Sequence, residues 1–321
     1  MADFDESPST FGAAAYGGDG WSPRTRSSSE EIGDVWAGCG IINEWAPLKS
    51  VLLHRPGQEL VASDDPDSMQ LLDTIDLGRA QAEHDEIADS YRTHGVTVHD
   101  LEPDSPATPN QMFCADLLFM TPEGAILSRP ASTVRAGEER QVARRLSSLG
   151  IPIVRTMRGL ATTEGADAAW IDSETVLIGR GLRTNQAAID QITSTLAEME
   201  VSVIAVDVPF GTMHLMGMLR IVDRDLALAW PRRTPHAAVM ALRDRGYEVA
   251  FIPSEEEATD NRSLNLVTLG PRKVLTVADN PISRRFYEKL GIECITAPAA
   301  ELGKAAGAIG CLTGVLWRES T

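Results

Sequence analysis

The sequence is poor in positive charge. Its 321 residues include 29 Lys and Arg against 46 Asp and Glu, which gives a formal net charge of −17 at pH 7. Proteins that bind nucleic acid or anionic membrane surfaces neutralise phosphates with clustered basic residues. So large an acidic excess excludes these two kinds of partner, whereas it favours the approach of a small cationic substrate.

Long apolar runs are absent as well. No run reaches the roughly 18 residues that a membrane-spanning helix needs. The acidic residues 1–6 lack the basic-then-apolar pattern of a secretory signal. The cysteines are few, with neither close pairing nor metal-ligand spacing (Cys39, Cys114, Cys294, Cys311). We therefore expect free thiols in a cytoplasmic protein that contacts no membrane.

The N-terminal segment contrasts with the rest of the chain. Residues 1–36 are rich in Gly, Ser and acidic residues, which cannot bury much apolar surface. We expect this segment to be disordered or draped over the surface, with a lid or an oligomer arm as the alternative. Residues 37–321 are predicted to form a single α/β domain that carries the functional site.

Glycine and proline residues separate the elements of a repeating pattern in that domain. A strand pair, an amphipathic helix and a returning strand, as in residues 170–206, recur about five times at roughly 50-residue spacing. One such ββαβ unit cannot bury its faces alone, so we predict that the units pack around an axis as a propeller-like array. An ordinary open α/β sheet fits the same pattern and stays open as the alternative.

Candidate reactive residues are spread along the chain. Cys311 lies among small residues, which leave room for a substrate carbon to approach sulfur. Taken alone, a cysteine among apolar residues is more typical of a buried core thiol. His214 lies in an apolar segment, and Glu164 and Asp167 lie in one acidic turn. One Cys with a His and scattered carboxylates is the pattern of a nucleophilic cysteine enzyme whose site assembles in the fold.

Asp116 is the least ordinary of these residues. It lies within the apolar run 113–119, where a carboxylate is costly to bury unless it is paired or hydrogen-bonded. Asp116, Glu164 and His214 each precede one repeated unit, and Cys311 follows the last. In a closed ring, equivalent ends of the units converge on the axis, so these residues are expected to meet there.

Five short segments together resemble the guanidino-group-modifying superfamily, which includes arginine deiminases, dimethylarginine dimethylaminohydrolases and arginine amidinotransferases. The segments are 109–116, 163–167, 179–185, 213–215 and 310–313. The resemblance runs from about residue 40 to the C-terminus in order and spacing. It implies a five-bladed α/β propeller with pseudo-fivefold symmetry and a small guanidine substrate similar to arginine.

The resemblance also implies a role for each matched residue. Cys311 is the expected nucleophile, His214 the acid and base, and Glu164 the third catalytic residue. The expected substrate-binding residues are Asp116 for the guanidinium, together with Asn110, Arg135, Arg183, Asp167 and Met216. No cofactor and no metal is expected, because the bound cation already supplies the charge. The oligomeric state stays open, with a homo-oligomer among the possibilities.

Two departures from the deiminase pattern bear on the substrate. Met216 stands where deiminases have an aspartate, and Ala115 replaces the arginine before Asp116. An apolar thioether in place of a carboxylate suits an N-alkylated guanidine. We therefore expect a hydrolase of arginine or a substituted arginine that forms citrulline through a covalent S-amidino intermediate. The alternatives are an amidinotransferase that releases ornithine, an arginine dihydrolase and a non-catalytic propeller.

Overall fold

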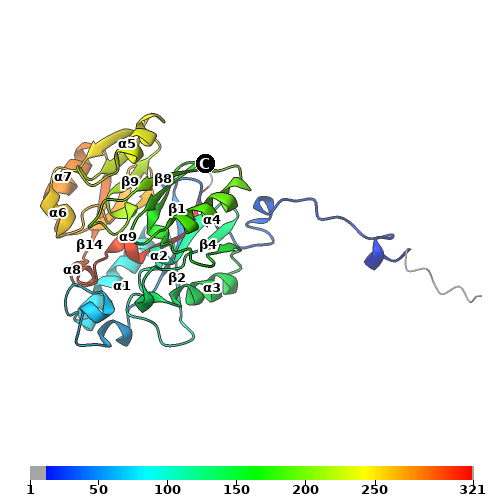
Figure 1. The fold of residues 1–321 in the computed structure, drawn as a ribbon, viewed down its shortest axis with the longest axis horizontal. Coiled ribbons are helices and arrows are strands. Elements are labelled where there is room, and N and C mark those ends of the chain that lie inside the picture. The colour runs from blue at the N-terminus through cyan, green and yellow to red at the C-terminus, as the bar shows by residue number, and fades with distance from the viewer. Residues whose placement is uncertain (1–11, 320–321) are drawn as a thin grey trace, which may run out of the picture.

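The computed structural model describes residues 12–319. The part of the expected N-terminal extension that falls on residues 1–11 lies outside the described residues. Residues 12–27 are almost entirely exposed and run away from the body as the dark blue segment of Figure 1. Contact with the body begins at Ser28, whose hydroxyl donates to Glu123 at 2.8 Å.

The strands form five separate three-stranded sheets rather than one continuous open sheet. Their bounds are β1 (Leu48–Leu53), β2 (Thr97–Asp100), β3 (Leu118–Thr121), β4 (Gly124–Leu127), β5 (Ile153–Thr156), β6 (Ala168–Asp172), β7 (Thr175–Arg180), β8 (Ser202–Asp207), β9 (Leu219–Asp223), β10 (Leu226–Ala229), β11 (Glu248–Phe251), β12 (Val267–Gly270), β13 (Lys273–Val277), β14 (Glu293–Ala297) and β15 (Gly314–Arg318).

All five sheets share one pairing scheme. The central strand pairs antiparallel with one neighbour and parallel with the other, as β7 does with β6 and β8. Parallel strands need a crossover connection, and a helix supplies it in each unit. The helices are α1 (Leu77–Thr93), α2 (Cys114–Leu117), α3 (Glu138–Ser148), α4 (Gln186–Ala197), α5 (His236–Arg243), α6 (Glu255–Thr259), α7 (Pro281–Lys289), α8 (Ala300–Gly303) and α9 (Ile309–Leu312).

Local sequence explains where the crossover helices begin and end. Asn185 caps α4 because its side chain accepts from the Ala188 amide at 3.0 Å. Asp76 caps α1 in the same way, through the Arg79 amide. Gly95 follows α1 with φ +77°, a left-handed conformation that glycine adopts without steric strain.

The sheet that contains β1 joins the two ends of the described domain. Its first strand, β15, comes from the C-terminus and pairs antiparallel with β1, with Leu52 opposite Gly314 and Leu48 opposite Arg318. The sequence analysis did not predict a strand after Cys311. This pairing explains why the first unit lacks a strand of its own before β1.

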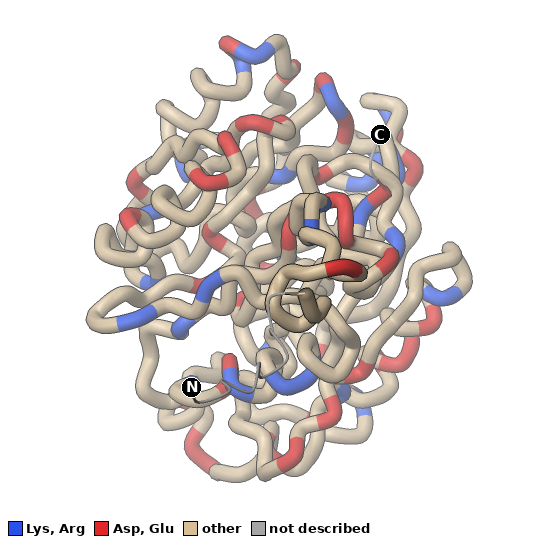
Figure 2. Tube along the Cα trace, turned by 90° about the vertical axis from the view of Figure 1, so that its right-hand side faces the viewer, with Lys and Arg blue, Asp and Glu red and all other residues tan. Residues whose placement is uncertain are grey.

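Apolar side chains fill the space within and between the units. Buried clusters surround Trp170, Leu53, Leu177 and Leu228, each with 0–1% of its surface exposed. None of the helices in the described residues is long and apolar enough to cross a membrane. On the side seen in Figure 2, Lys and Arg are interspersed with Asp and Glu rather than gathered in a basic track.

Candidate active site

The candidate residues occupy equivalent positions in different units. Asp116 lies on α2 just before β3, and Glu164 and His214 each precede the short 3-10 helix that leads into β6 or β9. Cys311 lies on α9, just before β15. The structure therefore brings together the four residues that the sequence analysis expected to meet, with α9 near the middle of the ribbon in Figure 1.

Asn265 completes this series, because it lies just before β12 in the remaining unit. The sequence pattern does not single it out, because its apolar neighbours make residues 264–268 resemble a strand, whereas the strand begins at Val267. Asn265 has the same place in its unit as the other site residues have in theirs, and this equivalence was the signal that could have identified it. Five units thus contribute one polar or nucleophilic side chain each.

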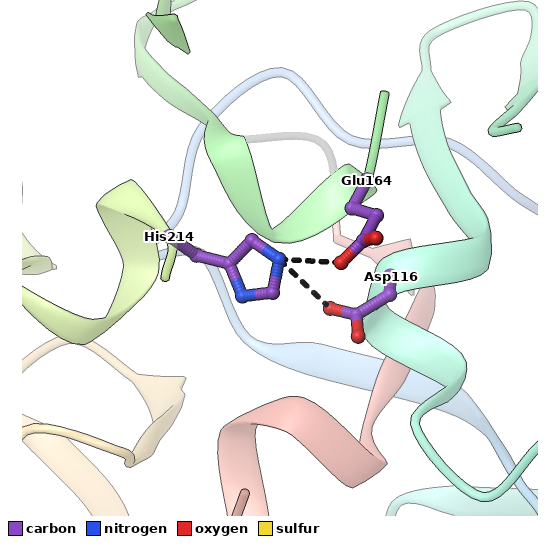
Figure 3. Close-up of side chains that lie close together, drawn as sticks. All are labelled: Asp116, Glu164 and His214. Carbon is purple, nitrogen blue, oxygen red and sulfur yellow. Dashed lines mark hydrogen bonds and ion pairs between the residues drawn. The ribbon is translucent and has the colours of Figure 1, made fainter. Parts of the chain in front are cut away.

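A buried acid–base cluster lies at the centre of the site (Figure 3). His214 Nε2 is 2.6 Å from Glu164 Oε2 and 3.9 Å from Asp116 Oδ1. Burial alone lowers the pKa of His214, but the surrounding Asp116, Glu164 and Asp167 outweigh it and raise that pKa to about 9. His214 is therefore a cation at neutral pH, and its second ring nitrogen points away from both carboxylates.

Arg135 is the second cation of the cluster. Its Nη1 donates to Asp116 Oδ2 at 2.6 Å and to Glu164 Oε2 at 3.3 Å, and its Nε donates to Glu138 Oε2 at 2.9 Å. Arg183 donates to Glu164 Oε1 at 3.2 Å. Both arginines that were expected to bind substrate are thus engaged by carboxylates of the chain itself.

These cations set the charge of Glu164. Burial raises the pKa of this carboxyl, but the hydrogen bond from His214 and the charges of Arg135 and Arg183 overcome burial and hold the pKa well below its usual range. Glu164 has 0% of its surface exposed. A buried carboxylate with three cationic neighbours is therefore the electrostatic anchor of the site.

The same cluster has the donor types of a metal site. One ligand atom each from Asp116, Glu164 and His214 lies within 4.8 Å of the others. Arg135 already bonds to both of these carboxylates, so a guanidinium of the chain takes the place that a metal cation would take. The donor set is therefore suited to binding guanidinium groups.

Asp167 and Asn110 hold the framework of the site. Asp167 accepts from the Thr184 hydroxyl at 2.7 Å and from the Leu215 amide at 3.0 Å, which fixes the backbone directly after His214. Burial raises the pKa of Asp167 to about 6, against the opposing effect of His214. Asn110 donates to the Met69 carbonyl at 2.8 Å.

Asn265 holds Cys311 from two directions. Its Oδ1 accepts from the Cys311 amide at 3.1 Å, and its Nδ2 donates to the Cys311 sulfur at 3.0 Å. A Cβ on Gly310 would lie 2.0 Å from Arg220 Nη2 and 2.9 Å from Asn265 Oδ1, so this contact requires glycine before the cysteine. Burial and the charge of Asp116 raise the pKa of Cys311, and the Asn265 hydrogen bond opposes them.

Two cavities meet at Cys311. The carboxylate cavity, of about 310 Å³, is lined by residues that include Asn110, Asp116, Arg135, Arg183 and Cys311. The methionine cavity, of about 860 Å³, is lined by residues that include Met213, His214, Met216, Met218, Trp230 and Cys311. The Cys311 sulfur is therefore accessible to a ligand from both cavities, and the two cavities present different side chains to that ligand.

Comparisons with known proteins identify the family and the fold of the chain. A family model described as N,N dimethylarginine dimethylhydrolase, eukaryotic, matches residues 67–279. A dimethylarginine dimethylaminohydrolase from Streptomyces coelicolor is 25% identical over 267 residues, which are 83% of this chain and 96% of the relative.

Solved structures share the fold. The dimethylarginine dimethylaminohydrolase of Pseudomonas aeruginosa in complex with citrulline has a TM-score of 0.71 and 21% identity, over 85% of this chain and 100% of that one. An amidinotransferase from Microseira wollei has a TM-score of 0.71 and 15% identity, over 88% and 98%. The mixed α/β fold of small sheets and the superfamily resemblance are confirmed, and the chain belongs to the N,N-dimethylarginine dimethylhydrolase family of guanidino-group-modifying enzymes.

Proposed function

We propose that this protein is a cysteine-dependent hydrolase of arginine or a substituted arginine, which forms citrulline through a covalent S-amidino intermediate. The observation that carries the proposal is the position of Cys311 at the meeting of two cavities, one of which contains Asp116 and the other His214. A planar cation that fits between them presents its carbon to the sulfur.

Substrate binding uses the carboxylate oxygen of the cluster that has no hydrogen-bond partner. Asp116 Oδ1 is buried and has no hydrogen-bond partner among the described residues, while Oδ2 accepts from Arg135. A guanidinium N–H donated to Oδ1 satisfies that oxygen and fixes the plane of the substrate. The bound positive charge next to Cys311 also offsets the effect of Asp116 and favours the thiolate, whose proton passes to solvent.

The chemical steps then follow from the charges. The Cys311 thiolate forms a bond to the guanidinium carbon, and His214, already protonated, gives its proton to the departing amine as the C–N bond breaks. Neutral His214 next takes a proton from water, and the resulting hydroxide bonds to the same carbon. Breaking the C–S bond restores the thiolate, and loss of the hydroxyl proton to solvent leaves neutral citrulline.

Product analysis tests the proposal. The protein is incubated with L-arginine and with N-methylated arginines, and the products are separated as citrulline and ornithine. Citrulline supports the hydrolase, and ornithine supports an amidinotransferase or a dihydrolase. If neither product forms from any arginine derivative, the proposed function is wrong.

We further infer that the five sheets are the blades of a propeller with pseudo-fivefold symmetry, and that residues 37–321 form its single catalytic domain with 1–36 as an extension. The shared pairing scheme of the five sheets supports this arrangement. So does the equivalent position of one site residue before the first strand of each sheet.

Activity is expected to fall as pH rises through about 9. The pKa of His214 is raised to about 9, so the protonated form that serves the leaving amine persists through neutral pH and is lost above that value. The profile of kcat between pH 6 and pH 10 measures this midpoint. A midpoint near the ordinary histidine value of about 6.5 would contradict the assigned role of the carboxylates.

Asn265 is expected to act as a positioning residue for the thiolate. Asn265→Asp keeps an acceptor for the Cys311 amide but loses the donor to sulfur, so the pKa of Cys311 should rise further. The rate of alkylation by iodoacetamide, measured from pH 7 to pH 10, should show the midpoint rising by about one unit, a tenfold slower reaction at pH 8.

The control for this experiment is Asn261→Ala, a change at an exposed residue of the same loop. It should leave the alkylation midpoint at the wild-type value. If the alkylation midpoint of Asn265→Asp equals that of wild type, Asn265 does not position the Cys311 thiolate. A purely structural role for Asn265 would lower thermal stability without moving the alkylation midpoint.

A further inference from the structure

The methionine cavity is larger than a methylamine requires. Its volume of about 860 Å³ includes space open to solvent, and about 270 Å³ of it is room for a ligand, close to the lower end of the range of roughly 300–1,000 Å³ for ligand pockets. It adjoins Cys311 and His214, whereas Asp116, Arg135 and Arg183 line the carboxylate cavity and not this one. The cavity therefore has room for a substituent that the carboxylate cavity does not accommodate.

The walls of the cavity next to the site are apolar and adaptable. Met218 and Leu264 are each 1% exposed, and Met213, Met216 and Trp230 complete the lining near the sulfur. Methionine side chains have three rotatable bonds and a polarizable sulfur, so they adjust to the shape of an alkyl chain. The inner part of this cavity suits methylene groups.

Two arginines lie at the boundary of the cavity. The guanidinium carbon of Arg233 lies 5.0 Å from the centroid of the Trp230 ring, and its Nη1 donates to the Gly211 carbonyl at 3.3 Å. Arg262 donates to the Asp260 carbonyl at 3.1 Å. Within residues 12–319, neither guanidinium has a carboxylate oxygen within 4.0 Å, whereas Arg135 and Arg183 are both paired.

Arg233 and Arg262 lack a carboxylate partner although the chain is acidic. Acidic residues outnumber basic ones by 46 to 29, so carboxylate partners are abundant elsewhere on the protein. Burial lowers the pKa of Arg262, which is the effect of removing a cation from water without a full counter-charge. An anionic group on a ligand would supply that counter-charge, with bidentate geometry available from either guanidinium.

The position of His214 tells which part of the substrate enters this cavity. His214 lines the methionine cavity and, among the described residues, is not part of the lining of the carboxylate cavity. The amine that receives the His214 proton therefore leaves on the side of the methionine cavity. Its substituent must lie in the same space.

We propose that the natural substrate is an Nω-substituted arginine whose substituent is longer than methyl and ends in an anionic group, such as a carboxylate, bound by Arg233 and Arg262. This inference rests on the proposed function. Water supplies the oxygen of citrulline, the bond from the guanidino carbon to the substituted nitrogen breaks, and that nitrogen leaves as an amine that carries the anion.

Three synthetic substrates test the inference: Nω-methyl-L-arginine, Nω-propyl-L-arginine and Nω-(2-carboxyethyl)-L-arginine. We expect kcat/KM for the carboxyethyl compound to exceed that for the propyl compound at least tenfold. Arg233→Gln and Arg262→Gln should each lower kcat/KM for the carboxyethyl compound about tenfold or more, with a much smaller loss for the propyl compound. Arg232→Gln, at an exposed arginine that pairs with Glu255 at 3.5 Å, is the matched control and should change neither value.

The outcomes separate this inference from the proposed function. Equal or better hydrolysis of the propyl compound, or equal losses for both compounds in the two variants, would overturn the anionic subsite. Citrulline from the methyl compound alone would overturn it while leaving the hydrolase intact. No citrulline from any compound would overturn both, and ornithine would place the arginine side of the substrate in the methionine cavity. The wild-type series alone is decisive if a variant fails to fold.

Discussion

Cys311→Ser is expected to lower kcat/KM at least about 10³-fold, which corresponds to about 4 kcal/mol of transition-state stabilisation. A serine hydroxyl keeps the hydrogen bond with Asn265 but is a far weaker nucleophile at neutral pH than a thiolate beside a bound cation. Binding should persist, because the carboxylates that hold the guanidinium are unchanged. Steady-state assays and calorimetric titration with the same substrate measure the two effects.

Cys294→Ser is the matched control for this experiment. Cys294 is a half-buried free thiol on β14, away from both cavities at Cys311. Its replacement should leave kcat/KM within about twofold of wild type. Trapping supplies an independent check: a haloacetamidine, which carries the substrate's charge, should label wild-type Cys311 and be slowed by arginine. Wild-type activity in Cys311→Ser would contradict the covalent mechanism.

Glu164→Gln is expected to produce the largest loss of stability among isosteric changes at the site. It removes the carboxylate that faces Arg135, Arg183 and His214, with distances of 3.3, 3.2 and 2.6 Å. Breaking a buried ion pair by removing one partner typically destabilises a protein by about 3–5 kcal/mol. Urea unfolding at pH 7 measures this loss, and the pKa of His214 should fall in the same variant.

The pH dependence of that loss has a definite sign. The pKa of Glu164 is lowered in the folded protein, so its contribution to stability is present above the unfolded value of about 4.5 and disappears as pH falls through the folded value. Wild type and Glu164→Gln should therefore converge in acid. Asp207→Asn, which breaks an exposed ion pair with Arg180 at 2.7 Å, is the control and should leave stability essentially unchanged. Equal stability of Glu164→Gln and wild type at pH 7 would contradict the anchor role.

Much of the site was predictable because its residues keep fixed places in a repeated unit. Asp116, Glu164, His214 and Cys311 could each be located from local pattern and superfamily resemblance, and the structure brings them together. Asn265 was not predicted as a site residue, because its neighbours are apolar and the pattern is typical of a strand that already includes Asn265. Local pattern cannot distinguish the first residue of a strand from the last residue of the irregular segment before it.

Other features depend on distant contacts that no local pattern contains. The pairing of Arg135 with Asp116, Glu138 and Glu164 depends on how two units meet, so the sequence predicted Arg135 as a substrate-binding residue and not as part of this cluster. The strand β15 was missed because its partner, β1, lies more than 200 residues earlier. The raised pKa of Cys311 likewise follows from burial and from the nearby charge of Asp116.

The pairing of β1 with β15 also bears on how the protein is made. During synthesis β1 emerges more than 200 residues before β15, the strand that covers its antiparallel edge. That edge, apolar over Val51–Leu53, stays open until β15 has been made and invites pairing with other chains. Because Cys311 immediately precedes β15, the pairing that covers the edge of β1 also fixes the chain next to the proposed nucleophile. Formation of this sheet and placement of Cys311 are therefore a single step of folding.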